Sequence, residues 1–110
     1  MSNKVRKITV IRVCPIKRQM TKIFVLRDPK VFAKLLNATA IAQAEVMKVD
    51  NKPVILAAAA ETPPMAPKFR IKGFGEVAGT AILLGYHADR GCNVPVDLKW
   101  AARMIEWIDG

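Results

Sequence analysis

The chain has 110 residues, and 52% of them are hydrophobic. Its formal net charge is +9 at pH 7. This length and composition predict one folded globular domain over 1–110 and argue against a disordered tail. No apolar run approaches the roughly 20 residues of a membrane span, and no secretory signal is recognisable, so we expect a cytoplasmic protein without membrane contact. Two cysteines, Cys14 and Cys92, are too few for a disulfide framework and are expected to be reduced.

The first predicted elements are two strands and a short helix. Lys7–Cys14 is rich in Ile and Val on both faces, which is typical of a central strand. Residues 15–21 interrupt it, and Lys22–Leu26 is expected to be a second strand. Asp28-Pro29 then predicts an N-cap and the first position of a helix that ends near Asn37.

The middle of the chain predicts a second hairpin followed by a loop. Ala40–Val49 and Val54–Ala60 are expected to be strands joined by a turn at residues 50–53, although the alanine run also suits a helix. Glu61–Pro67 contains three prolines, which exclude a helix or a central strand.

Two more strands are expected after this loop, at Phe69–Ile71 and Gly79–Tyr86, with a polar turn at His87–Asn93. Asp97 predicts the N-cap of a last helix, whose apolar stripe runs from Leu98 to Ile108. The order of elements predicts an α+β fold, in which a small, mostly antiparallel sheet of four to six strands carries two helices on one side.

Residue patterns that would indicate catalysis or cofactor binding are weak. The glycines of GFGEVAG have the wrong spacing for a nucleotide-binding loop and precede a predicted strand. His87, Asp89 and Cys92 lack the spacing of a zinc site, and a Cys92–His87 nucleophilic pair lacks an orienting third group. We therefore predict no enzymatic activity, no cofactor and no metal.

The net positive charge is confined to the first third of the chain. Residues 1–34 contain ten Lys or Arg and one acid, whereas residues 35–110 contain eight bases and eight acids. This asymmetry favours an anionic partner, either nucleic acid or a nucleoprotein complex with an acidic surface. The alternative is that lysines on edge strands only discourage aggregation between sheets.

Seven of these bases are the predicted phosphate contacts, on a hairpin tip and a neighbouring helix. They are Arg6, Arg12, Lys17, Arg18, Lys22, Lys30 and Lys34. Contacts of this kind position a nucleic acid without reading its sequence and make binding strongly dependent on salt. Phe24 and Phe32 are assigned to the core, so base stacking is not expected.

A second hypothesis places the functional surface on the last helix. Trp100 and Trp107 are seven residues apart and would share one flank of it, with Arg103 between them. Because Trp is enriched at protein interfaces, this flank predicts a protein–protein interaction module or a homodimer.

Phe69–Asp109 also carries an F-x-x-x-G segment, a small-residue strand, a D-x-G turn and a closing helix. The matching residues are Phe69, Gly73, Ala78, Gly79, Ala81, Leu83, Gly85, Asp89, Gly91 and the helix from Asp97. This pattern resembles the C-terminal half of a family of small proteins encoded by bacteriophages and mobile elements. The family is of unknown function, so the resemblance implies a phage or mobile-element context and no active site. Because small non-enzymatic phage proteins often block host machinery, this context leads us to expect a protein that acts in a bacterial host cell and inhibits a host defence system, in the manner of anti-CRISPR proteins.

Overall fold

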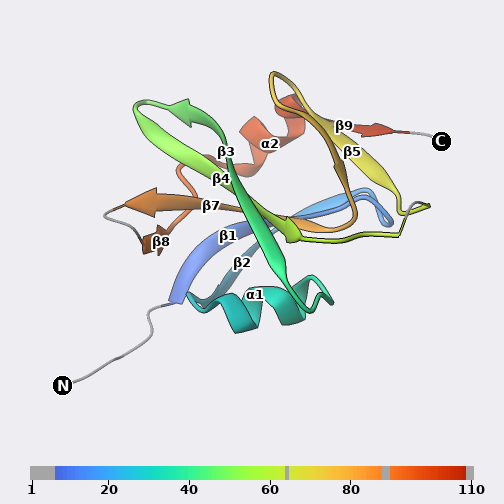
Figure 1. Cartoon of the computed structure of the whole chain (residues 1–110). Coiled ribbons are helices and arrows are strands. Elements are labelled where there is room, and N and C mark those ends of the chain that lie inside the picture. Colours follow the sequence, from blue (N-terminus) through green and yellow to red (C-terminus); the bar gives the residue numbers. More distant parts are fainter. Residues whose placement is uncertain (1–6, 64, 88–89, 109–110) are drawn as a thin grey trace.

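Two antiparallel sheets and two short helices make up the described part of the chain, residues 7–63, 65–87 and 90–108 of a computed structural model. The larger sheet has six strands, in the order β2-β1-β7-β4-β3 with β8 paired to β7, and the smaller sheet has the order β6-β5-β9. In chain order the elements are β1 (Lys7–Cys14), β2 (Gln19–Leu26), α1 (Pro29–Leu35), β3 (Ile41–Val49), β4 (Lys52–Ala59), β5 (Lys68–Ile71), β6 (Gly75–Ala78), β7 (Ala81–His87), β8 (Arg90–Cys92), α2 (Leu98–Met104) and β9 (Ile105–Ile108). Figure 1 shows this arrangement, which confirms the predicted α+β class.

The central position of β1 follows from its apolar residues on both faces. It pairs with β2 on one side and with β7 on the other, and Ile8, Val10, Ile11 and Val13 are all buried. Beside it, β2 is an edge strand that starts at Gln19, three residues before the predicted start. Its residues alternate in burial because one of its faces is open to solvent over part of its length.

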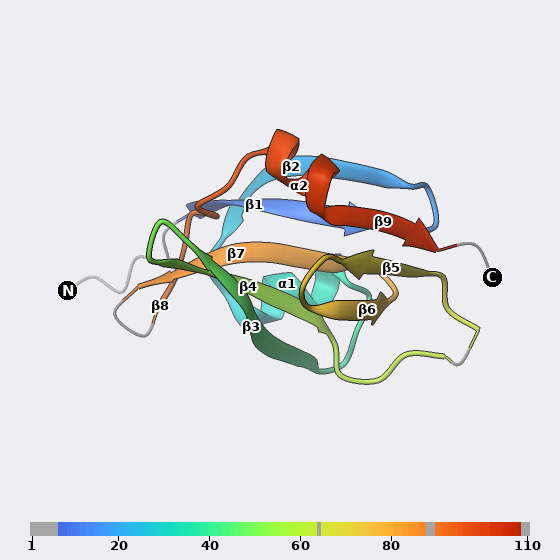
Figure 2. The same cartoon turned by 90° about the horizontal axis from the view of Figure 1, so that it is seen from above.

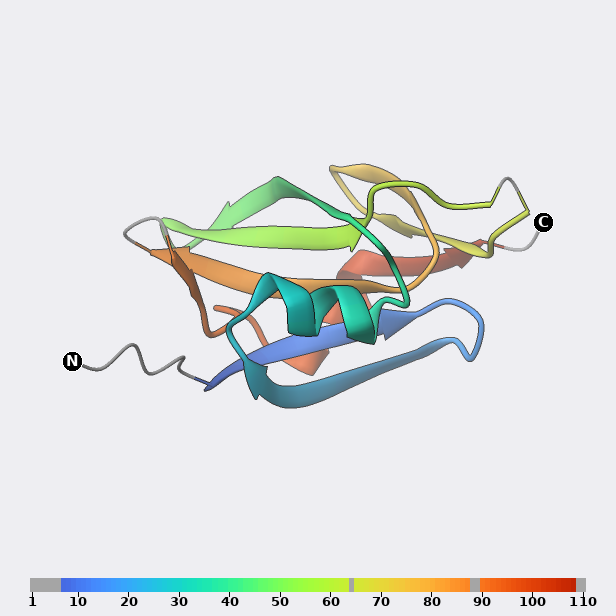
Figure 3. The ribbon, with the colours of Figure 1, turned by 60° about the horizontal axis from the view of Figure 1, so that its bottom comes forward.

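The two helices pack on opposite faces of the six-stranded sheet, which corrects the prediction that both lie on one side. Phe32 of α1 belongs to a core cluster with Val10 and Leu84, whereas Ala101 of α2 belongs to a second cluster with Ile11. Neighbouring residues of one strand point to opposite faces, so the two clusters lie on either side of the sheet. Figures 2 and 3 show α2 over β1 and β2 from one side and α1 over the sheet from the other.

The capping predictions are confirmed, but the last helix is shorter than expected. The side chains of Asp28 and Asp97 accept hydrogen bonds from the backbone N–H groups of Lys30 and Trp100 at 2.9 Å. The helix α2 ends at Met104, and the residues expected to continue it form β9 instead. The free edge of β5 offers backbone partners, and β9 pairs with it in an antiparallel ladder.

Two further differences concern β4 and β8. The alanine run lies in β4, whose pairing with both β3 and β7 prevails over the helical propensity of alanine. Within the predicted polar turn at His87–Asn93, Arg90–Cys92 forms β8 and pairs with β7. Gly85 allows this close approach, because a Cβ atom there would lie 2.3 Å from the backbone oxygen of Asn93.

Neither α1 nor α2 has the length and apolar character required to cross a bilayer, and the described ranges contain no other helix.

Candidate functional site

The predicted phosphate-contact residues do not share one face. Lys17 and Arg18 are exposed in the turn between β1 and β2, and Lys30 and Lys34 are exposed on α1. Lys22 pairs with Ile11, so its side chain is on the α2 side of the sheet, opposite to α1. The strand alternation and the packing of α1 on one face together separate Lys22 from the helix lysines. Arg6 lies outside the described residues.

Arg12 is half-buried on the α1 face of β1. It shares this face with Val10, and its Nε atom is buried without a hydrogen-bond partner within residues 7–63, 65–87 and 90–108. A guanidinium held in this way is less accessible to a phosphate backbone than the exposed lysines.

Phe24 is not a core residue, contrary to the sequence expectation. Its side chain is 65% exposed on β2, whereas Phe32 is 2% exposed, as expected. The Lys7 Nζ atom lies 5.9 Å from the centroid of the Phe24 ring, a distance at which a cation interacts with the face of a ring. Lys22 and Leu26 share the face of Phe24, two residues away on either side, and Leu26 is 40% exposed. We call these four residues, Lys7, Lys22, Phe24 and Leu26, the Phe24 surface.

The Phe24 surface is open because the elements on that face end before reaching it. Ile11 and Val13, further along β1, are fully buried beneath the cluster that includes α2 and the smaller sheet. At the start of β1, the segment before α2 is hydrogen-bonded to the strand: Val94 N–H donates to the Thr9 carbonyl, and Thr9 N–H donates to Asn93 Oδ1. Phe24 and Leu26, on the neighbouring strand, are still 65% and 40% exposed. The outward face of β2 therefore stays in solvent at this end.

The proposed partner-binding residues are separated by the end of α2. Trp100 lies on α2, but Trp107 lies on β9, so the two indoles do not share a helix flank. Both are half-buried and pack against the larger core cluster, and the Trp107 ring meets Phe69 edge to face with centroids 6.3 Å apart. Arg103 is exposed near the end of α2.

His87 and Cys92 line one hollow of about 420 Å³ with Lys52 and Asn93, but the thiol is not activated. Burial raises the pKa of Cys92 above its ordinary value, which disfavours the nucleophilic thiolate. Asp89, the third residue of the imagined metal set, lies outside the described residues. Across the ranges that the structure describes, no three His, Cys, Asp or Glu side chains gather in a way that would hold a metal ion.

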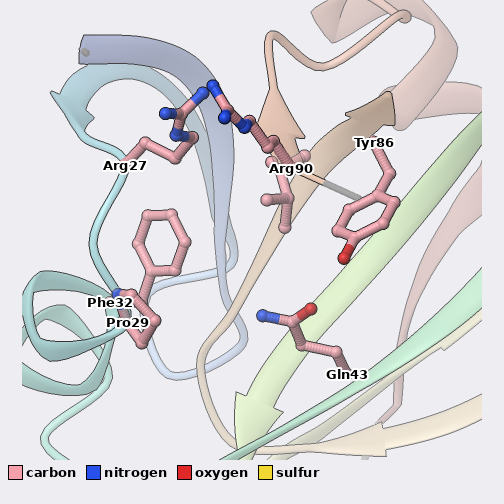
Figure 4. A pocket seen from close by; sticks show the side chains of 8 residues that line it. Arg27, Pro29, Phe32, Gln43, Tyr86 and Arg90 are labelled. Atoms are coloured by element: carbon pink, nitrogen blue, oxygen red, sulfur yellow. The ribbon is translucent and has the colours of Figure 1, made fainter. Parts of the chain in front are cut away.

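A pocket of about 260 Å³ opens beside α1, on the face opposite to the Phe24 surface. Its lining residues, which we call the arginine pocket, are Arg27, Pro29, Phe32, Gln43, Leu84, Tyr86, Arg90 and Gly91. Figure 4 shows the guanidinium groups of Arg27 and Arg90 approaching each other at one end. At the other end, the Tyr86 hydroxyl and the Gln43 amide face each other.

Four elements, α1, β3, β7 and β8, and the segment between β2 and α1 bring the pocket residues together from distant parts of the sequence. Leu84 lies on the α1 face of β7, and Tyr86, two residues further along the strand, lies on the same face. Gln43 lies on the α1 face of β3, because its pairing partner Ala57 packs toward α1. Arg27 leaves the end of β2, and β8 supplies Arg90. Gly91 leaves room for the Arg27 stem, since a Cβ atom there would lie 3.5 Å from Arg27 Cγ and 3.0 Å from Leu84 Cδ1.

Sequence reasoning assigned none of the pocket residues to a site. In the sequence, Arg27 contributes only to the charge of the first third, and Arg90 falls in a predicted turn. The signal that would have found them is the pairing of β8 with β7, which carries Arg90 back to the end of β2. For Phe24, the signal was its position on an edge strand between Lys22 and Leu26.

Comparison with known proteins adds no relative: no protein-family model, no curated protein and no solved structure matches the chain. The resemblance to phage and mobile-element proteins therefore rests on the sequence motifs alone and stays a prediction.

Proposed function

We propose that this protein is a non-enzymatic binder of single-stranded nucleic acid, which it contacts through the Phe24 surface. The observation that carries the proposal is the exposure of the Phe24 ring, 65%, beside the ammonium group of Lys7. Proteins that bind single strands combine an exposed aromatic ring, on which a base stacks, with cations that contact the backbone phosphates.

The charges around the ring favour a polyanion over an apolar partner. Lys7 and Lys22 lie on the same face as Phe24, and Thr9, the residue opposite Phe24 on β1, is uncharged. A base stacked on the ring would place its flanking phosphates near these two ammonium groups. Unpaired bases are required, because the bases of a duplex are already stacked on each other.

The wider assignment extends the sequence-based hypothesis. Lys17 at the hairpin tip lies on the same hairpin and would extend the phosphate track, whereas Lys30 and Lys34 lie beyond the opposite face. A phage or mobile-element origin, and inhibition of a host defence complex that contains nucleic acid, are part of this proposal through the sequence resemblance.

The interaction-module hypothesis is less favoured. Trp100 and Trp107 both contact the core, and the edge-to-face contact of Trp107 with Phe69 accounts for its position without a partner. Homodimerisation through Arg103 and the exposed side of α2 remains the alternative.

Fluorescence anisotropy with short labelled single-stranded DNA and RNA tests the proposal. Phe24→Ala should weaken binding by about five- to a hundredfold, the loss of one stacked base, and Phe24→Trp should restore it. Lys7→Ala and Lys22→Ala should each lower the slope of log affinity against log salt by about 0.7, one phosphate contact on a single strand.

Lys72→Ala is the matched control, because Lys72 is an exposed lysine in the turn between β5 and β6. It should change the affinity less than Lys7→Ala does. Wild-type protein that binds no single strand, or Phe24→Ala protein that binds as tightly as wild type, would overturn the assignment.

A further inference from the structure

We propose that the arginine pocket is a second binding site, for a ligand that combines a phosphate monoester with a planar base, which is the chemistry of a single nucleotide. The site lies on the α1 face of the sheet, whereas the Phe24 surface lies on the other face. The inference therefore goes beyond the proposed function and stands on separate residues.

The charge of the pocket specifies an anion. Arg27 and Arg90 are the charged residues among its lining residues, and no Asp or Glu is included. No ion pair or hydrogen bond of either guanidinium to a carboxylate occurs within the described ranges. Two cations that approach each other repel, and an anion bound between them removes that repulsion.

The type of cation favours an anion with several oxygens, such as a phosphate. A guanidinium presents its N–H donors in a planar fork that binds two oxygens of one phosphate, and two guanidinium groups can share the oxygens of a terminal phosphate. A terminal monoester has three free oxygens and a charge near −2 at pH 7, so it matches two arginines better than a bridging diester does.

The remaining walls fit a ring. Leu84 and Phe32 are almost fully buried and close the floor and one side with apolar atoms. Tyr86 is 37% exposed, so its ring is accessible for stacking from the open side. The Gln43 amide offers both donors and an acceptor, which is what the hydrogen-bonding edge of a base requires.

The size of the pocket limits the ligand to about one nucleotide. Its volume, about 260 Å³, is just below the range of about 300–1,000 Å³ that is usual for ligand pockets. The buried floor also prevents a strand from running through it. Two sources have the required chemistry: a free nucleoside monophosphate, and the phosphorylated terminus of a strand.

Isothermal titration calorimetry with adenosine and uridine 5′-monophosphates tests the site. We expect saturable binding that weakens at least about tenfold when the nucleoside without phosphate is used, since a charge-assisted contact is lost. Arg90→Ala and Arg27→Lys should each weaken monophosphate binding at least about tenfold, the second because lysine keeps the charge but cannot bind bidentately. Circular dichroism and the unfolding midpoint of each variant show whether it is folded.

Two controls keep this site separate from the Phe24 surface. Phe24→Ala should leave monophosphate binding unchanged, and Lys72→Ala should do the same. Oligonucleotides with and without a 5′-phosphate distinguish the two sources: tighter binding of the phosphorylated strand that depends on Arg27 and Arg90, without binding of free monophosphates, assigns the pocket to strand termini.

Equal binding of nucleoside and monophosphate would overturn the inference, and so would folded Arg27 and Arg90 variants that bind as wild type does. Absence of binding by both free monophosphates and 5′-phosphorylated strands would also overturn it. If the arginine pocket binds no phosphate but single strands still bind in a Phe24-dependent way, the inference is wrong and the proposed function is still supported. If the pocket binds monophosphates but no single strand binds at Phe24, only the inference is supported.

Discussion

The two faces of the six-stranded sheet are covered in different ways, and the difference places the candidate sites. On one face, α1 packs Phe32 onto the central strands and leaves a pocket at its own N-terminal side. On the other face, α2 and the smaller sheet cover Ile11 and Val13 but leave the end of β2 open at Phe24. One face therefore offers a pocket for a small ligand, and the other an open surface for an extended one.

The two phenylalanines provide the largest expected contrast between these faces. Phe32 is 2% exposed and Phe24 is 65% exposed. Phe32→Ala should lower the free energy of unfolding by about 3–5 kcal/mol, because it removes a buried ring and leaves a cavity. Phe24→Ala should change it by about 0.5 kcal/mol or less, as expected for an exposed position. Urea unfolding followed by tryptophan fluorescence measures both.

Equal destabilisation by the two substitutions would contradict the comparison, because it would mean that Phe24 is packed in solution. In that case the open surface would not exist, and the stacking role proposed for Phe24 would fall with it. A small effect of Phe24→Ala on stability combined with a large effect on nucleic-acid affinity is the result that separates a binding residue from a core residue.

Gly85 supports the α1 face indirectly, by letting β8 approach β7. A Cβ atom at this position would lie 2.3 Å from the Asn93 backbone oxygen and 2.9 Å from Cys92 Sγ, so Gly85→Ala must displace the backbone. We expect a loss of about 1–3 kcal/mol in the free energy of unfolding, typical of overpacking. Because β8 carries Arg90, monophosphate binding should weaken in the same variant.

Gly91→Ala is the matched substitution in the same hairpin. Its new Cβ atom would meet Leu84 Cδ1 at 3.0 Å and atoms of the Arg27 side chain, all of which belong to side chains that can rotate. It should therefore destabilise the protein less than Gly85→Ala does. The opposite order in urea unfolding would show that β8 does not hold the position that assembles the pocket.

The elements that follow from local chemistry were predictable, and those that depend on distant pairing were not. Both N-caps, at Asp28 and Asp97, and the bounds of β1 follow from short patterns that the structure retains. The conversion of Ile105–Ile108 from helix to strand depends on the free edge of β5, far away in the sequence. Likewise, β8 exists because β7 extends beyond β1 and presents unpaired backbone groups.

The same distinction explains which site residues were missed. Charge counting identified the lysines of the first third, because charge is a local property of the sequence. It did not show that Lys22 and Lys30 lie on opposite sides of the sheet, since that depends on where α1 packs. Arg27 and Arg90 meet only after β8 folds back, and no short motif in the sequence encodes this meeting.

The smallest expected effect concerns the cap of α2, the helix that covers Ile11 and Val13. The hydrogen bond from the Trp100 backbone N–H is the main reason that the pKa of Asp97 lies below its ordinary value of 3.8, and the charges of Lys99 and Arg103 add to it. A carboxyl with a lowered folded-state pKa stabilises the folded protein above its unfolded-state pKa, and this stabilisation is lost as the pH falls through the folded-state value.

Asp97→Asn isolates this contribution, because asparagine also caps helices but does not titrate. The difference in the free energy of unfolding between wild type and Asp97→Asn should be constant above about pH 5 and shrink as the pH falls below the ordinary pKa of aspartate. Urea unfolding from pH 6 down to pH 3 measures it, with wild-type protein as the reference at each pH. A difference that stays constant over this whole range would mean that the ionised carboxylate does not hold the start of α2. In that case α2 would be held over Ile11 and Val13 by the apolar contacts of Ala101 and Trp100 alone. Packing, and not the cap, would then set the boundary between the covered strands and the open Phe24 surface.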